Sequence, residues 1–185
     1  MKTGGSGDLV STMLPVIIRF PRMTAPFKTC EPYKESKSAY KVLSVNFQGE
    51  KDRPELGEFR RFQESLQRQL MLLCMRTEGP GANALPNVQD LIQAPKKKAY
   101  SDLMNIKFIP ERVTWVDEEG NPMRFSDIVF GNVDVELVAQ LVDVFKCVHP
   151  QTRKVTYFPR YFAIQCVVCK KQVVPEFNVD LVELH

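Results

Sequence analysis

The sequence has no apolar run close to the roughly 18 residues that a membrane-spanning helix requires. Its opening segment, MKTGGSGDLVSTM, also lacks the apolar core of a secretion signal. We therefore interpret residues 1–12 as a flexible leader and residues 13–185 as one folded domain, because 185 residues are enough for a single good core. We expect no membrane partner.

Residues for catalysis are scarce. The two histidines are His149, in an expected turn, and His185, so a Cys/His or Ser/His nucleophile system has little material. There is no glycine-rich phosphate loop. The carboxylates of DEEGN (Asp117–Asn121) suit a glycine turn and lack the ligand spacing of a calcium loop. We predict no catalytic residue and no enzymatic activity.

The five cysteines, an odd number scattered along the chain, do not suit a secreted disulfide framework and indicate free thiols in a reducing, intracellular compartment. Cys166 and Cys169 have the spacing of half a zinc site. They fall in a β-branched run, however, and residues three apart in a strand point to opposite faces. No second Cys or His pair completes four ligands, so we predict no metal and no other cofactor.

Alternating apolar residues predict two strands in the first 47 residues. MLPVIIRF (13–20) is β-branched, with its even-numbered residues from Leu14 to Phe20 on one face. YKVLSVNF (40–47) alternates cleanly and directs Leu43, Val45 and Phe47 inward.

One helix is predicted between residues 52 and 78. Asp52 can cap it, Pro54 is tolerated in the first turn, and Gly79 begins the GPG that ends it. Apolar residues recur at spacings of three and four and form one stripe: Leu56, Phe59, Phe62, Leu66, Leu70 and Leu73. Three arginines lie off that stripe and are expected on a solvated face: Arg60, Arg61 and Arg68.

A long polar loop is expected at about residues 79–101, and loops of this length are usually functional or disordered. It contains APKKKAY, in which Lys96, Lys97 and Lys98 cannot all share one face and repel one another unless anions are present. These lysines, with Tyr100 beside them, are candidate nucleic-acid contacts. The alternative, an inert lysine triplet, stays open.

The second half predicts further strands. Residues 104–125 suggest short strands around Pro110, with Trp115 in the core or exposed. Residues 133–148 suit a helix or a strand, and their six valines favour the strand. After the turn HPQTRK, YFAIQCVVCKKQVV returns as its partner. The fold class is therefore mostly β, with five or six strands and one inserted helix.

The segment HPQTRKVTYFPRYFAIQC (149–166) crowds rings and cations together. If Phe162, Ile164 and Cys166 share the core face, alternation turns Tyr161 outward. A base can stack on such a ring for about 1–3 kcal/mol, and its phosphate releases counterions to a cation. The predicted contacts are Tyr161, Tyr157, Arg153, Lys154, Arg160 and Lys170. The alternative is that Tyr157 and Phe158 close a barrel end.

The order of these segments adds a resemblance. The order along the chain is two strands, a capped helix, a basic loop and a final hairpin. The second strand is YKVLSVNFQGE, the helix contains PELGEFRRFQESL, and the hairpin consists of NVDVELVAQLVDVF and YFPRYFAIQCVVCKKQV. The chain resembles, over residues 10 to 175, the OB-fold single-stranded DNA-binding proteins of nucleocytoplasmic large DNA viruses (African swine fever virus-like). The resemblance implies a partly open OB-fold-like barrel and sequence-tolerant binding in viral DNA replication, repair or packaging, without catalysis.

Two functions from different classes follow. The first is single-stranded DNA binding; RNA, a homo-oligomer and replication proteins stay open as further partners. The second is a protein–protein scaffold of a replication or packaging complex, with Phe and Tyr as anchors. A viral chain of the first kind is expected at replication sites in the host cytoplasm or in the virion. Salt distinguishes the two, because only affinity for phosphates falls steeply with salt.

Overall fold

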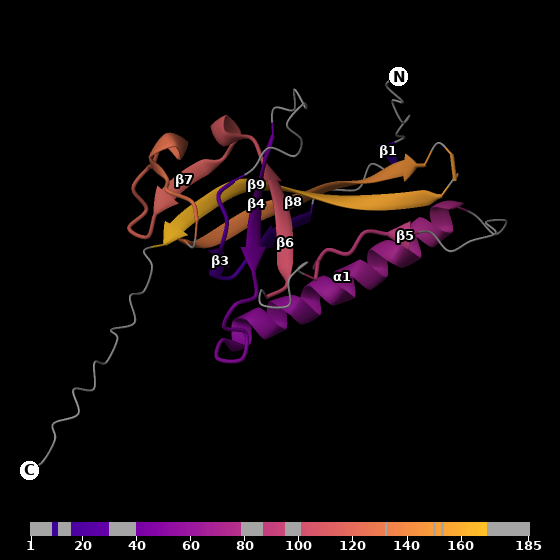
Figure 1. The fold of residues 1–185 in the computed structure, drawn as a ribbon, viewed down its shortest axis with the longest axis horizontal. Coiled ribbons are helices and arrows are strands. Elements are labelled where there is room, and N and C mark those ends of the chain that lie inside the picture. The colour runs from indigo at the N-terminus through magenta and orange to yellow at the C-terminus, as the bar shows by residue number, and fades with distance from the viewer. Residues whose placement is uncertain are drawn as a thin grey trace, which may run out of the picture.

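Two long strands, β8 (Val133–Val148) and β9 (Val155–Cys169), pair antiparallel and form the centre of a mixed sheet (Figure 1). This computed structural model describes residues 9–10, 16–29, 40–78, 87–94, 101–131, 133–149, 151–152 and 154–169. The other strands are β1 (Leu9–Val10), β2 (Val16–Arg19), β3 (Met23–Ala25), β4 (Lys41–Asn46), β5 (Asn87–Val88), β6 (Leu103–Phe108) and β7 (Thr114–Asp117). The helices are α1 (Pro54–Glu78) and two short 3-10 turns, η1 (Pro110–Arg112) and η2 (Phe125–Asp127).

Five strands close into a ring. β8 pairs with β3, β3 with β4, β4 with β6, β6 with β9, and β9 with β8 again. Two of these strand pairings are short. β3 pairs with β4 only at Thr24 and Asn46, and β6 pairs with β9 only at Lys107 and Phe162. The barrel is therefore only partly closed. The predicted class, a mostly β OB-fold-like barrel with one inserted helix, is confirmed.

The remaining strands are short and pair with the two long ones. β1 and β2 pair with β8, while β5 and β7 run parallel to β9. Strands of two to four residues carry too little alternation to be read from a sequence, so the sheet has more strands than expected. β1 falls in the expected leader, whose other residues lie outside the described ranges, and β5 falls in the expected loop.

Helix α1 lies along one side of the barrel, with β5 beside it (Figure 1). Its buried residues are Leu56, Phe59, Gln63, Leu70 and Cys74. The stripe differs from the prediction at several positions. Leu66 and Leu73 are half-buried, and Cys74, next to Leu73, is buried. Phe62 is 46% exposed, and Gln63 is buried in its place. Helical geometry places the core-facing turn between Phe59 and Leu70 at position 63, where a polar residue concealed the pattern.

Two further predictions hold, and the structure decides where Trp115 lies. Leu43, Val45 and Phe47 are buried, and residues 133–148 form a strand. Trp115, which the sequence left open between core and surface, is in the core and packs edge-on against Phe108, with ring centroids 5.5 Å apart. Its indole N–H donates to the carbonyl oxygen of Pro110 at 3.1 Å, which satisfies the one polar atom of the ring.

The pairing of β8 with β9 contains two bulges. Val138 pairs with Gln165 and Ala139 with Ala163, so β9 has Ile164 as an extra residue there. A second shift between Leu141 and Asp143 leaves an extra residue in β8. Because each bulge inserts one residue, it exchanges the inward and outward sets on either side of it.

Pro159 lies inside β9, although the sequence suggested that the strand begins after it. On the edge of β9 away from β8, β5 pairs up to Tyr157 and β6 pairs at Phe162. Pro159 lies between these two partners, so its missing N–H leaves no described ladder bond unmade. No helix among the described residues is long and apolar enough to cross a membrane.

Candidate nucleic-acid interface

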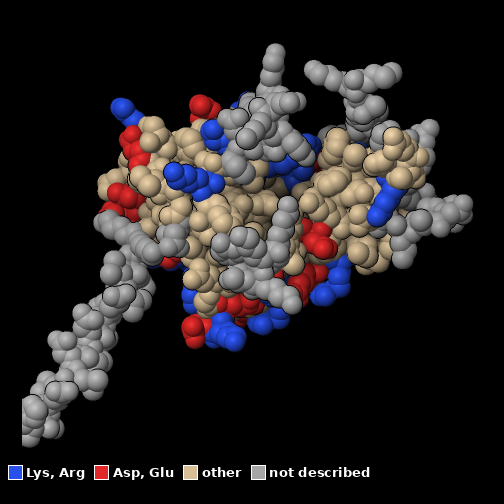
Figure 2. All heavy atoms as spheres, viewed as in Figure 1, with Lys and Arg blue, Asp and Glu red and all other residues tan. Residues whose placement is uncertain are grey.

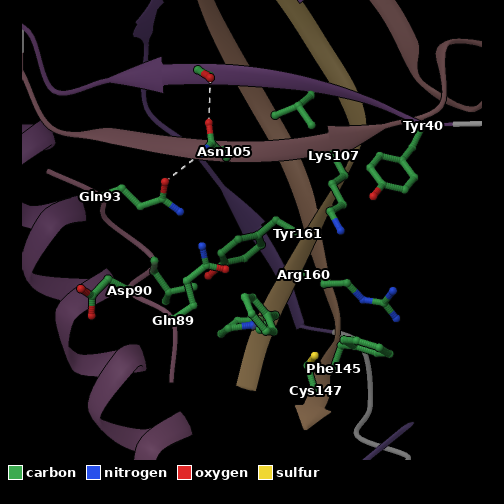
Figure 3. A pocket seen from close by; sticks show the side chains of 15 residues that line it. Tyr40, Gln89, Asp90, Gln93, Asn105, Lys107, Phe145, Cys147, Arg160 and Tyr161 are labelled. Carbon is green, nitrogen blue, oxygen red and sulfur yellow. Dashed lines mark hydrogen bonds between the residues drawn. The ribbon is translucent and has the colours of Figure 1, made fainter. Parts of the chain in front are cut away.

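A groove of ≈ 570 Å³ lies between the outer face of β4 and β6 and the pair of strands β8 and β9 (Figure 3). Outward residues of β4 and β6 alternate with the buried ones and supply one wall: Val42, Ser44, Asn105 and Lys107. Phe145, Phe158 and Arg160 come from β8 and β9. The segment after β5 adds the amides of Gln89 and Gln93 and the carboxylate of Asp90, so the groove contains apolar, cationic, amide and acidic groups together.

Half-buried aromatic rings line this groove. Phe145 and Phe158 are register partners on β8 and β9, and Tyr40 precedes β4. The Tyr40 ring meets Phe162 edge-on, with centroids 6.2 Å apart. Rings that are only partly covered can stack on the flat face of a base.

Two cations lie against these rings. The Lys107 ammonium is 4.6 Å from the centroid of the Tyr40 ring, and among the described residues it has no carboxylate partner. The Arg160 guanidinium is 5.3 Å from the centroid of the Phe145 ring and is paired with Asp143. Arg160 donates hydrogen bonds to Asp143, and these raise its pKa, whereas burial alone would lower it.

The opposite side of the groove is polar. In Figure 3, Gln89, Asp90 and Gln93 lie across from Lys107 and Arg160. The Ser44 hydroxyl donates to Oδ1 of Asn105 at 2.7 Å, and Nδ2 of Asn105 donates to Oε1 of Gln93 at 3.0 Å. This chain orients the Gln93 amide, whose nitrogen can donate to a base or sugar oxygen.

The predicted outward orientation of Tyr161 is wrong. Its side chain is 3% exposed, forms part of the groove floor and packs edge-on against Phe20. Its hydroxyl donates to Oε1 of the buried Gln63 at 2.9 Å. The prediction assumed unbroken alternation back from Cys166, whereas the bulge at Ile164 reverses the faces before Tyr161 is reached.

The same bulge places Tyr157 and Phe162 on the opposite faces of β9 from those predicted. Tyr157 is fully buried, which favours the alternative that it closes part of the barrel and rules out an exposed ring. Phe162, expected in the core, is half-buried beside Tyr40. The outward set of β9 before the bulge is therefore Phe158, Arg160 and Phe162.

The remaining predicted contacts divide into two groups. Arg160 lines the groove, and Lys154 is exposed near the turn that joins β8 to β9. The others lie outside the described residues: Lys96, Lys97, Lys98, Tyr100, Arg153 and Lys170. Their roles stay predictions.

Sequence reasoning missed four aromatic or cationic residues of the groove: Tyr40, Lys107, Phe145 and Phe158. A signal for Lys107 existed, because it lies between the inward Ile106 and Phe108 in a clean alternation. Phe145 could not be placed without the bulge in β8. Tyr40 reaches the groove only because the residues of β4 and β6 pair in the observed register.

The charges of α1 are mostly solvated, as predicted for Arg61 and Arg68. Arg60 differs, because it donates to Glu50 and Asp102 and lies over the Phe47 ring at 4.3 Å. Figure 2 shows positive and negative side chains interleaved along the edge over the helix, and positive ones beside the hollow near the middle of the same face.

Cys166, Cys169 and the two residues between them lie in β9, as predicted, and both cysteine side chains are buried. Burial raises the pKa of both thiols, that of Cys169 to about 11. The described part of the chain contains no group of three or more His, Cys, Asp or Glu side chains that could hold a metal ion.

The fold matches that of gp2.5, a single-stranded DNA binding protein encoded by bacteriophage T7. The two structures superpose with a TM-score of 0.57 and 10% sequence identity, over 83% of this chain and 91% of the phage chain. At this identity the likeness shows a shared fold. No family model matches the sequence, and no curated protein matches it.

Proposed function

We propose that this chain binds single-stranded DNA in the groove between β4, β6 and the β8–β9 pair, without catalysing a reaction. One observation carries the proposal: half-buried rings and a lysine without a carboxylate partner among the described residues share one concave surface of a partly open barrel. Stacking and phosphate neutralisation are the two contributions that sequence-tolerant binding of single strands requires.

The rings proposed to stack are Tyr40, Phe145 and Phe158, with Phe162 behind Tyr40. They replace Tyr157 and Tyr161 as the stacking candidates, because those two are buried. Lys107 is proposed to hold a phosphate, with further charge from Lys154 at the hairpin and from the lysines of the basic loop. The bases of a double helix are stacked on one another and have no free faces, so single strands are the proposed ligand.

The fold shared with the phage protein supports the part of this proposal that concerns single-stranded DNA as the ligand. It does not favour the large-DNA-virus group over other single-strand binders. Membership of that group, and a role in viral DNA replication, repair or packaging, are therefore a finer part of the proposal and rest on the order of sequence segments.

Fluorescence anisotropy tests the proposal with a labelled single strand of mixed sequence, a matched duplex and a matched RNA. We expect binding to the single strand, a much weaker signal with the duplex, and a log–log salt dependence of clear negative slope. Equal affinity for the duplex, or no binding to the single strand at low salt, contradicts the proposal.

A scaffold function is the second candidate, and a separate surface favours it. Ile17 is 62% exposed and lies in an open apolar depression with Val16 and the exposed Phe62. Such a patch suits a protein contact. Two results together would identify this function. The chain would bind a protein partner with an affinity that barely changes with salt, and it would not bind DNA.

A further inference from the structure

Arg160 and Asp143 form a paired group at the edge of the groove. Nε and Nη2 of Arg160 donate to the two carboxylate oxygens of Asp143, one nitrogen to each oxygen. The Asp143 side chain is 7% exposed and the Arg160 side chain 28% exposed. The two residues are register partners on β9 and β8, at the second bulge.

The pairing removes most of the positive charge that Arg160 could offer to a phosphate. A phosphate that approaches Arg160 also approaches the Asp143 carboxylate a few ångströms behind it, so attraction and repulsion largely cancel. Counterions are released from a nucleic acid in proportion to the phosphates neutralised. A charge that is already neutralised within the protein therefore contributes little to the salt dependence of binding.

The same pairing leaves the flat face of the guanidinium in place. The two-point contact fixes its plane, and Cζ lies 5.3 Å from the centroid of the Phe145 ring. Figure 3 shows both side chains at the same end of the groove. Bases stack on guanidinium planes as they do on aromatic rings. Nη1 takes no part in the contact with Asp143, so its N–H groups remain able to donate.

We propose that Arg160 contacts a nucleobase through its planar face and does not neutralise a phosphate, and that Asp143 is the positioning residue that holds the plane and cancels the charge. This inference rests on the proposed function. Lys107 is the contrasting case in the same groove, because its ammonium has no carboxylate partner among the described residues.

The test compares salt slopes for a labelled single strand. Arg160→Ala alone would leave the Asp143 carboxylate buried and unpaired. The main variant is therefore Asp143→Asn with Arg160→Ala, which keeps the net charge of the chain. We expect it to weaken binding at one salt concentration by about 5- to 150-fold, with the slope unchanged. Lys107→Ala should flatten the slope by about 0.7, the contribution of one phosphate on a single strand.

Two further variants sharpen the result. Arg160→Lys should bind no better than the double variant, because an ammonium has no plane to stack and cannot bridge both oxygens of Asp143. Asp143→Asn alone should steepen the slope by up to about 0.7, since it frees the guanidinium charge. Melting curves confirm that each variant is folded.

The possible outcomes are distinguishable. If the wild-type chain does not bind single strands, both the proposed function and this inference are overturned. If it binds, and the double variant flattens the slope as much as Lys107→Ala does, the inference alone fails, because Arg160 is then a phosphate contact. An unchanged affinity in the double variant, or an unchanged slope in Asp143→Asn, overturns the inference as well.

Discussion

The hydroxyl of Tyr161 on β9 donates a hydrogen bond to Oε1 of Gln63 on α1, at 2.9 Å and across 98 residues of sequence. Both side chains are buried, so this bond connects the helix to the barrel inside the core. Burial raises the pKa of Tyr161, and its phenol therefore stays a neutral donor at any ordinary pH. Nε2 of Gln63 has no partner within the described part of the chain.

The first prediction concerns this pair. Tyr161→Phe should lower the free energy of unfolding by about 1–3 kcal/mol, because it leaves Oε1 of Gln63 buried without a donor. Tyr161→Ala should cost about 3–5 kcal/mol, as the truncation of a buried ring. Urea denaturation measures both changes.

A double variant provides the control. Replacing both polar partners by apolar groups of similar shape is often nearly neutral. Tyr161→Phe with Gln63→Leu should therefore be more stable than Tyr161→Phe alone. Additive losses in the double variant would show that the hydrogen bond is not the source of the effect.

The second prediction concerns the groove rings. Phe158→Ala should weaken single-strand binding by about 1–3 kcal/mol through the loss of one stacked base. Phe62→Ala is the matched control, because Phe62 is an exposed phenylalanine on α1 that does not line the groove. Anisotropy titrations of the two variants should separate them, and equal losses would place the binding surface elsewhere.

The third prediction uses thiols as reporters. Cys147 is half-buried in the groove, whereas Cys74, Cys166 and Cys169 are buried. At pH 8 Cys166 and Cys169 form little thiolate, because their pKa values are raised and a thiol stays protonated when the pH is well below its pKa. Cys30 lies outside the described residues, so Cys30→Ser removes its thiol from the comparison. In that background Cys147 should react first with a thiol reagent, and single-stranded DNA should slow that reaction. Unchanged labelling with saturating DNA would contradict a ligand in this groove.

The fourth prediction concerns Lys96, Lys97 and Lys98, which lie outside the described residues. If they hold phosphates by charge alone, neutralising all three should weaken binding equally for every base sequence. The salt slope should flatten by up to about two to three. Exchanging Arg61 and Arg68 on the outer face of α1 for glutamine is the control, and an unchanged slope in the lysine variant would identify the triplet as a solvated one.

Much of the fold could be predicted because its signals are local. The alternation of Leu43, Val45 and Phe47 is sufficient to define β4, and Pro54 with the glycines after residue 78 bounds α1. The density of valines between residues 133 and 148 was enough to choose a strand over a helix. In each case the residues that decide the structure are neighbours in the sequence.

The binding surface depended on the tertiary structure. The sequence by itself determined that rings and cations gather after His149, in a mostly β chain with one helix. Which of those rings face outward was decided by the bulge at Ile164, while the bulge between Leu141 and Asp143 turned Phe145 of β8 toward the same groove. A bulge exists only in the pairing of two strands, so no periodicity in either strand reveals it. Since one inserted residue exchanges the two faces, Tyr161 became part of the core and Phe158 became part of the groove.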